Sequence, residues 1–432
     1  MIYPGPLNRE QRLKTQKNYC IFNLINGASY MCLGETIIVL FAIKLNAPNG
    51  MVAALSATIY FAFFMLPVGK YVAGKVGAAR SQAVFWTIRN VVAVGVAASS
   101  LTAYFGYPVL ALVQIFVGAC LFYGLRAAGV VMSQPFIGDM ATESERPHLL
   151  GVSAALFYVG SVLSLLMIWA VLTWKESLNS ITGIIIWGAM LGLGSTYFIR
   201  QMDESPAMLE AARRPLMAEF KKVWQIADIR KLLPAMFTVT LSLIMLGAVS
   251  MLCVKRGLGM SDRSALYFSL IQFASCAGIS YLSGKIIRRF GARKSLFCSF
   301  SAMLCVGVLW LLSPLKMNYL YVTMLFILVG GAHVTNMNAT TAYYLQITPE
   351  PLRVAASMLT SVVTSVLAGL AGMLLSSTAF RIIDSKLADW EPMNRFKVYF
   401  AFALILLLAL SFLVWRLPEK KVKSEESAAK NS

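Results

Sequence analysis

The chain of 432 residues is 58% hydrophobic and 13% charged, and it carries 38 Lys and Arg residues against 19 Asp and Glu residues. Soluble globular chains are about a quarter charged, so this composition excludes an ordinary soluble domain and is typical of an integral membrane protein. The net charge of +19 does not require a nucleic acid, because the basic residues stand between apolar runs. The seven cysteines show no CxxC spacing and lie in or beside apolar runs, so we expect membrane-buried thiols rather than a metal site or disulfides.

Twelve apolar segments are each long enough to cross about 30 Å of hydrocarbon as a helix. In chain order they run near residues 19–44, 49–73, 81–104, 108–138, 148–172, 181–199, 233–254, 263–284, 295–313, 319–346, 354–379 and 396–415. The first follows a polar segment, residues 1–18, without a small-residue cleavage site, so we interpret it as a retained helix. The sequence therefore predicts an all-α integral membrane protein with two six-helix halves, residues 19–199 and 233–415.

A basic central loop, residues 200–232, separates the two halves. Within it Leu216, Phe220 and Val223 recur at helical spacing, which predicts an amphipathic helix on the inner membrane surface; a solvated tether is the alternative. Lys and Arg residues are concentrated in this loop, in alternate turns and at both chain ends, so the positive-inside rule places both termini in the cytoplasm. The tail, residues 416–432, has the composition of a disordered segment.

One basic turn occurs twice, once in each half, as KVGAARSQ around Gly77 and as RFGARKSL around Gly291. Both turns resemble the loop between helices 2 and 3 of the major facilitator superfamily, whose pattern is Gly, three residues, Asp, basic, any residue, Gly and two basic residues. The matching residues are Lys75 and Gly77, followed by Arg80, in the first copy, and Gly284, Arg289, Gly291 and Arg293 in the second. Gly74 and Arg288 stand where the family has Asp, so neither copy carries the acid that acts in gating.

A second pair of corresponding turns carries acids followed by an arginine. In the superfamily such groups pair with the basic loops of the opposite half when the inner side is closed. The resemblance therefore implies a cytoplasmic gate made by Glu143, Glu145, Arg146, Glu350 and Arg353 together with Lys75, Gly77, Arg80, Arg289, Gly291 and Arg293. Surface ion pairs contribute about 0–1 kcal/mol each, which suits a latch that opens in every cycle.

Ionisable residues inside the predicted spans are functional candidates, because a charge is costly in hydrocarbon. Glu35 is the one acid in the middle of a span, and it could be a proton carrier, an anchor for a cationic solute, the counter-ion of Arg126 or part of a wet outer vestibule. We expect Arg126 in the fourth span to act in solute binding or coupling; the alternative is a structural partner of Glu35 or the loop acids. Arg89 in the third span is either a site residue or a structural, snorkelling one.

The tenth span is the richest polar stretch of the second half. Its amides, hydroxyls and imidazole predict hydrogen bonds to a polar solute, and contacts between helices are the alternative. The candidates are His333, Asn336 and Asn338, with Gln272 on the eighth span. In the superfamily spans 1, 4, 7 and 10 line the central cavity, so the resemblance places Asn26, Glu35, Arg126, His333, Asn336 and Asn338 together. On an ideal helix Glu35 faces away from Asn26, and only a break at Gly27 or Gly34 would reconcile them.

No zinc spacing, nucleophile elbow, phosphate loop or dinucleotide fingerprint is present, so we predict neither an enzyme nor a cofactor. We expect a monomeric secondary transporter of the inner membrane, with a small polar anion as solute, the lipid bilayer as surroundings and protons as coupling ion. One alternative is an exporter of drugs or metabolites, although the fifth span lacks the GPxxGG run of the drug–proton antiporters. The other alternative is a membrane sensor that binds a solute without moving it.

Overall fold

The computed structural model of the chain describes residues 2, 5–48, 51, 55, 58, 62–175, 177–260 and 262–418, except the side chains of Glu35, Thr36 and residues 262–266. Within these ranges, eleven helical segments are long and apolar enough to cross a membrane. Each begins or ends within several residues of a predicted span. The remaining predicted span, residues 49–73, lies largely outside the described residues, and the structure shows its last part.

The first half consists of α1 (Arg9–Leu33), α2 (Glu35–Lys44), η1 (Ala62–Met65), α4 (Leu66–Val76), α5 (Ala78–Tyr104), α6 (Pro108–Val130), α7 (Ser133–Met140), α8 (Arg146–Trp174) and α9 (Leu178–Arg200). The first predicted span is broken, because Gly34 is extended (φ −69°, ψ 170°) between α1 and α2. Gly27 does not break the helix; a Cβ there would lie 1.9 Å from the carbonyl oxygen of Phe157, so this glycine lets α1 and α8 pack closely.

The second half consists of α12 (Ala227–Ser242), η2 (Leu243–Ala248), α13 (Val249–Leu252), η3 (Cys253–Gly257), α14 (Asp262–Phe290), α15 (Ala292–Leu312), α16 (Tyr319–Ile347), η4 (Glu350–Leu352), α17 (Arg353–Ser361), η5 (Val362–Leu367), α18 (Ala368–Lys386) and α19 (Pro392–Trp415). Three of these segments, η2, η3 and η5, are π-helical turns inside the seventh and eleventh spans. Such turns are wider than the α-helix and often occur at functional places in a helix.

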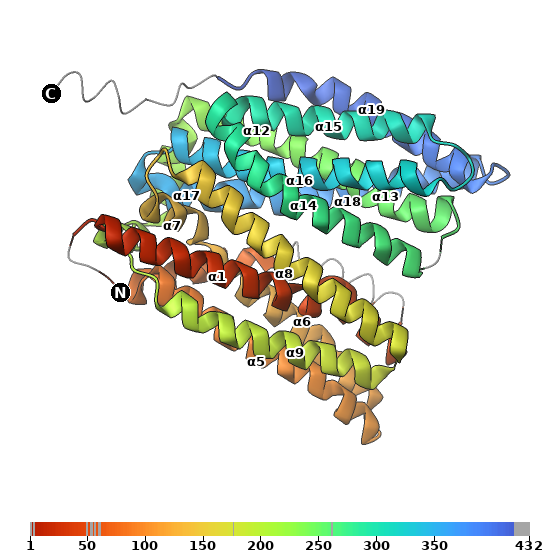
Figure 1. The fold of residues 1–432 in the computed structure, drawn as a ribbon, viewed down its shortest axis with the longest axis horizontal. Coiled ribbons are helices and arrows are strands. Elements are labelled where there is room, and N and C mark those ends of the chain that lie inside the picture. The colour runs from red at the N-terminus through yellow and green to blue at the C-terminus, as the bar shows by residue number, and fades with distance from the viewer. Residues whose placement is uncertain are drawn as a thin grey trace.

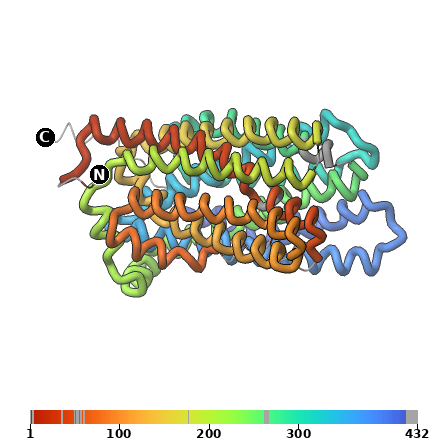
Figure 2. The backbone as a smooth tube through the Cα atoms, turned by 90° about the horizontal axis from the view of Figure 1, so that it is seen from below, coloured from red at the N-terminus to blue at the C-terminus, as the bar shows by residue number. Residues whose placement is uncertain are grey.

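The two halves lie side by side as two helical layers, with α8 of the first half against α14 of the second (Figure 1). The start of α1 and the end of α19 lie at the same end of the bundle, which we call the terminal end (Figures 1 and 2). The short helices α7 and α17 also lie there (Figure 1). An even number of crossings returns a chain to the side on which it starts, so this arrangement agrees with twelve spans.

The apolar core is divided in the same way. One cluster of buried side chains belongs to the first half and a second cluster belongs to the second half. A third cluster joins them at the terminal end and includes Trp86 and Met140 of the first half, Val223 of the central loop, and Tyr343 and Val354 of the second half. The halves therefore share a large common core at the terminal end.

Two glycines set the contact between the halves at this end. A Cβ on Gly284 of α14 would lie 2.5 Å from the carbonyl oxygen of Pro147, and one on Gly151 of α8 would lie 3.1 Å from the Cα of Gly284. The hydroxyl of Ser280 donates to the carbonyl of Gly151 at 2.9 Å. Small residues let two helices approach closely in a membrane, where packing and hydrogen bonds hold them together. The terminal end is thus closed.

The central loop forms two helices, α10 (Pro206–Arg213) and α11 (Leu216–Gln225). Helix α10 packs on α4 of the first half and α11 packs on α17 of the second. Val223 is fully buried and Phe220 packs on the shared core, so the amphipathic face contacts protein. The expected helix is present, with Val223 of its apolar face buried and Trp224 of the same face exposed, and its position at the inner membrane surface stays a prediction.

The duplicated turn has the same backbone in both halves. Gly77 (φ 95°) precedes α5 and Gly291 (φ 86°) precedes α15, and such angles strongly favour glycine. In the first copy a carboxylate oxygen of Glu204 accepts the N–H of Ala78 at 2.6 Å. A carboxylate from the chain after α9 therefore accepts the free N–H groups at the start of α5. Burial raises the pKa of Glu204, while the N–H groups at the start of α5 lower it.

Candidate functional site

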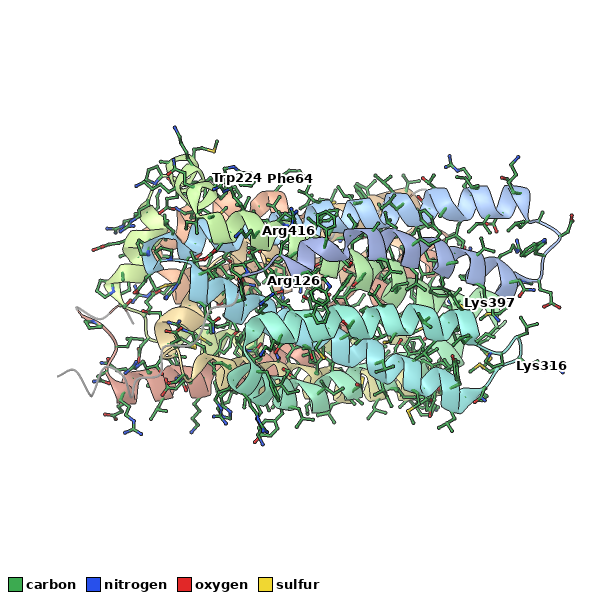
Figure 3. All side chains as sticks on the ribbon, turned by 90° about the horizontal axis from the view of Figure 1, so that it is seen from above. Phe64, Arg126, Trp224, Lys316, Lys397 and Arg416 are labelled. Atoms are coloured by element: carbon green, nitrogen blue, oxygen red, sulfur yellow. The ribbon has the colours of Figure 1, made fainter. Side chains whose placement is uncertain are left out.

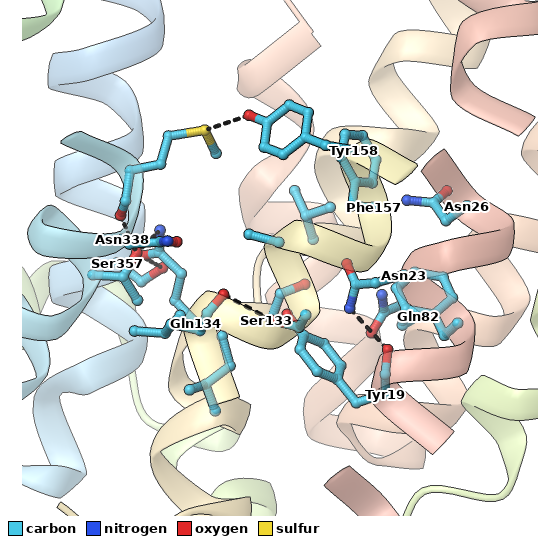
Figure 4. A pocket seen from close by; sticks show the side chains of 18 of the residues that line it. Tyr19, Asn23, Asn26, Gln82, Ser133, Gln134, Phe157, Tyr158, Asn338 and Ser357 are labelled. Carbon is cyan, nitrogen blue, oxygen red and sulfur yellow. Dashed lines mark hydrogen bonds between the residues drawn. The ribbon is translucent and has the colours of Figure 1, made fainter. Parts of the chain in front are cut away.

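A cavity of about 290 Å³ lies between the halves, next to the closed terminal end. Its walls come from α1, α5, α6, α7 and α8 of the first half and from α16 and α17 of the second. Figure 4 shows Asn26 and Gln82 on one side, Asn338 and Ser357 on the other, and Gln134 between them. Among the described residues that line the cavity, Arg126 is the only charged one.

Arg126 lies in the body of the bundle, far from Lys316 at the opposite end (Figure 3). Its guanidinium carbon is 4.5 Å from the ring centre of Tyr30 on α1. A cation over an aromatic face gains about 0.5–2 kcal/mol, which lowers the cost of burying the charge without neutralising it. No ion pair joins Arg126 to a carboxylate in the described part of the chain. The alternative pairing of Arg126 with Glu35 stays a prediction, because the side chain of Glu35 lies outside the described residues.

Trp86 and Asn26 form one wall of the cavity. The indole Nε1–H of Trp86 donates to Oδ1 of Asn26 at 3.1 Å, which joins α5 to α1. Trp86 is almost fully buried, with 1% of its surface exposed. This bond fixes the ring and leaves the amide nitrogen of Asn26 to serve as a donor to a solute.

Arg89 lies directly behind this wall and is completely buried. Its guanidinium carbon is 4.4 Å from the ring centre of Trp86 and 5.1 Å from that of Phe122. Nη2 donates to Oδ1 of Asn90 at 3.3 Å, whereas Nε and Nη1 have no partner within the described structure. Because its side chain is completely buried, Arg89 does not snorkel to the membrane surface.

The second half contributes neutral polar groups. The amide of Asn338 donates to the hydroxyl of Ser283 at 2.7 Å, and its side chain is nearly buried. Gln134 on α7 bridges the halves, since its Oε1 accepts from the hydroxyl of Ser357 at 3.2 Å and its Nε2 donates to Thr341 at 3.5 Å. These bonds form the floor of the cavity at the terminal end.

The structure places Asn26, Arg126 and Asn338 at the cavity, with Arg89 behind it, but His333, Asn336 and Gln272 are not among the described lining residues. The reason is helical rotation, because α16 turns Val334, Met337, Asn338 and Thr341 toward the cavity. Asn336 instead accepts a hydrogen bond from Thr340 of its own helix at 3.2 Å. The side chain of Glu35 lies outside the described residues, although its backbone begins α2.

Several polar lining residues were absent from the predicted site. They are Tyr19, Asn23, Gln82, Ser133, Gln134, Ser153, Tyr158, Thr341, Ser357 and Ser361. For Ser133 and Gln134 a signal was present, because Pro135 follows them within a long apolar run and predicts an interruption of the helix. That interruption separates α6 from α7 and turns Gln134 toward the other half. For Gln82 and Ser357 the sequence alone offers no such signal.

The predicted gate residues divide into two groups. Glu143, Arg146, Glu350 and Arg353 line a second cavity of about 430 Å³ where the two halves meet. Arg146 donates to the carbonyl of Gly138 at 3.0 Å, and Arg353 approaches the same carbonyl at 3.5 Å. Arginines of both halves thus converge on the end of α7.

The basic turns stand apart from this cavity. Lys75 lies over the ring of Tyr71, Arg289 lies over the ring of Phe290, and Arg293 donates to the carbonyl of Trp415, while Arg80 is exposed. Glu145 accepts the N–H of Thr142, and this bond holds the pKa of its carboxyl below the usual range. In this state the basic turns therefore do not meet the acidic ones in ion pairs of the described residues.

The fold is shared with solved transporters of low sequence identity. A bacterial homologue of the iron transporter ferroportin, solved in an outward-facing state, gives a TM-score of 0.69 at 10% identity, over 94% of this chain and 99% of that chain. The proton:xylose symporter XylE gives 0.68 at 13% identity over 98% and 100%, and the human organic anion transporter TETRAN gives 0.68 at 14% over 93% and 99%. These three carry different cargoes, so the likeness shows the fold alone.

No curated protein matches the sequence. A sequence model of the Major Facilitator Superfamily matches residues 19–373, which is most of the chain. The matched region covers both duplicated turns and reaches from the first half into the eleventh span. Together with the two helical layers around a central cavity, it establishes that the chain belongs to the major facilitator superfamily and is an integral membrane transporter.

Proposed function

We propose that the protein moves a small polar anion across the cytoplasmic membrane by alternating access, with the solute bound in the central cavity. The observation that carries this proposal is Arg126, the only charged side chain among the described cavity residues. Arg126 is half-buried, and a charge inside a membrane protein is costly without a counter-ion, so an anion that enters the cavity supplies the partner that the described part of the chain does not. The surrounding amides and hydroxyls suit a solute with further polar groups.

The closed terminal end supports a rocking mechanism. The halves meet there at the Gly151–Gly284 crossing and through the hydrogen bonds of Gln134. We assign this end to the cytoplasm, because Lys and Arg residues are concentrated there and the positive-inside rule applies. The structure then corresponds to a state that is shut toward the cytoplasm. Transport requires these contacts to separate while the cavity stays between the two halves.

We assign coupling to protons to Glu35. It follows the extended Gly34 directly, so the ideal-helix argument that turned it away from Asn26 no longer applies. A carboxyl held away from water takes up a proton closer to neutral pH than a solvated one does. The variant Glu35→Gln should exchange solute across vesicle membranes at the normal rate and lose accumulation driven by a pH gradient. Loss of both activities would assign Glu35 to solute anchoring or to structure instead.

The experiment that tests the anion site is a ligand-stabilisation screen on the purified full-length protein. Ligands that bind only the folded state raise its apparent stability by mass action. We expect small carboxylates or phosphorylated compounds to stabilise the wild type, to have no effect on Arg126→Gln, and to act normally on Lys316→Gln. The Lys316 variant removes an equal charge from an exposed residue at the opposite end. Stabilisation by lipophilic cations alone would favour an exporter and refute the proposal.

A further inference from the structure

Arg89 is a second positive charge near the cavity, and the proposed binding of an anion by Arg126 does not explain it. It is completely buried in α5, three residues after the cavity residue Trp86. Two of its three guanidinium nitrogens have no partner within the described structure. Arginine keeps its charge under all physiological conditions, so this site carries a permanent positive charge.

The neighbours of Arg89 stabilise this charge but do not cancel it. The rings of Trp86 and Phe122 face the guanidinium, and Asn90 accepts one hydrogen bond. Aromatic faces and an amide oxygen are neutral partners, so the net charge remains. Neither Arg89 nor Arg126 has an ion pair with a carboxylate in the described part of the chain.

Arg89 and Arg126 both lie next to the central cavity. Arg126 lines the cavity itself. Trp86 lines the same cavity, and the guanidinium of Arg89 lies against the ring of Trp86. The field of Arg89 therefore reaches the cavity across the Trp86 wall, where little water screens it. Among the charges of the described residues, a monoanion at Arg126 would leave that of Arg89 uncompensated.

We infer that the solute is a dianion, and that Arg89 is the residue that selects its second negative charge. This inference rests on the proposed function and names its solute class, a small dicarboxylate or a phosphate monoester. Arg126 contacts the solute in the cavity, whereas Arg89 acts through the wall as a fixed charge. A fixed positive charge beside the cavity attracts the second negative charge of a solute, because an effective dielectric of about 20 screens it less than water does.

The test compares solutes that differ by one charge and little else. The first pair is succinate and succinamate, and the second is glycerol 3-phosphate and its phosphate methyl ester. Binding to the purified full-length protein is measured by thermal stabilisation at about pH 8, above the second phosphate pKa of about 6. We expect the wild type to bind the dianion of one pair at least about tenfold more tightly than its monoanion. The pair that shows the preference identifies the solute as a carboxylate or a phosphate.

Variants of Arg89 then locate the source of the preference. Arg89→Gln should weaken binding of the dianion more than binding of the monoanion and so lose most of the preference, and Arg89→Lys should keep it. Arg126→Gln should lose both ligands. If Arg89→Gln does not fold, equal binding of the two members of both pairs by the wild type still refutes the inference.

Three outcomes would overturn the inference. They are equal binding of the two members of both pairs, a preference that survives in Arg89→Gln, and failure of all four compounds to bind. A monoanion that binds through Arg126 without any preference for a dianion would leave the proposed function intact. Binding of lipophilic cations alone would remove the proposed function as well.

Discussion

Lys70 and Glu219 form a buried ion pair that joins the first half to the central loop. Nζ of Lys70 lies 3.4 Å from the carboxylate of Glu219, and the two side chains are 5% and 4% exposed. Lys70 also donates to the carbonyl of Ala212 at 3.2 Å and to that of Arg214. Because α11 packs on α17, this pair links α4 of one half to the other half.

We expect Lys70→Met to destabilise the protein by about 3–5 kcal/mol, because it leaves the carboxylate of Glu219 buried without a partner. The double variant Lys70→Met/Glu219→Met should lose only about 1–3 kcal/mol, since the carbonyls that Lys70 satisfied remain without a donor. The free energies of unfolding are measured by denaturant titration in mixed micelles. Asp384→Asn, which breaks an exposed pair with Arg395, should cost about 0–1 kcal/mol and serves as the control.

The pH dependence of the free energy of unfolding is an independent test of the Lys70–Glu219 pair. Burial raises the pKa of Glu219 and the charge of Lys70 lowers it, so Lys70→Met should raise this pKa further. A carboxyl with a higher pKa in the folded state binds more protons when the protein is folded than when it is unfolded. The free energy of unfolding therefore rises as the pH falls toward about 4.3, the pKa of a glutamate carboxyl in the unfolded chain. Lys70→Met should therefore recover part of its loss between about pH 8 and pH 5. A loss under about 1 kcal/mol, or one that acid leaves unchanged, would refute this reasoning.

Two further predictions concern glycines. Gly77→Ala should destabilise the protein by about 1–3 kcal/mol, because φ is 95° and the new Cβ would lie 2.1 Å from the carboxylate of Glu204. Gly183→Ala, where a Cβ meets nothing within 4 Å, is the matched control, and equal stability of the two variants would contradict the prediction. Gly151→Leu should force α8 away from Gly284 and increase hydrogen exchange at the terminal ends of α8 and α14. Unchanged exchange would mean that this crossing does not hold the halves together.

The sequence predicted the spans well because each depends on local properties. Apolar length determines whether a segment can cross the membrane, and glycine determines where the backbone can turn, as Gly77 and Gly291 show by their positive φ angles. The sequence offered Gly27 and Gly34 as possible breaks of the first span, and the structure has the break at Gly34 and none at Gly27. Arg126 was a candidate because a charge inside an apolar run is costly wherever the helix faces.

What the sequence left open was the direction in which side chains point between helices. Asn336 and Asn338 are two residues apart on α16, yet only Asn338 lines the cavity, since 100° per residue separates their faces. Gln134 and Ser357 come from distant parts of the chain and meet only when the halves close.

Arg89 also separates what the sequence predicts from what only the tertiary structure shows. Its charge is evident in the sequence, but its burial between Trp86 and Phe122 depends on how α5 and α6 pack. The sequence by itself thus determined the membrane helices, the duplicated halves and the charged candidates, because these follow from composition and period along one chain. Only the tertiary structure decided which of those groups share the cavity, because that depends on rotation and contact between helices far apart in sequence.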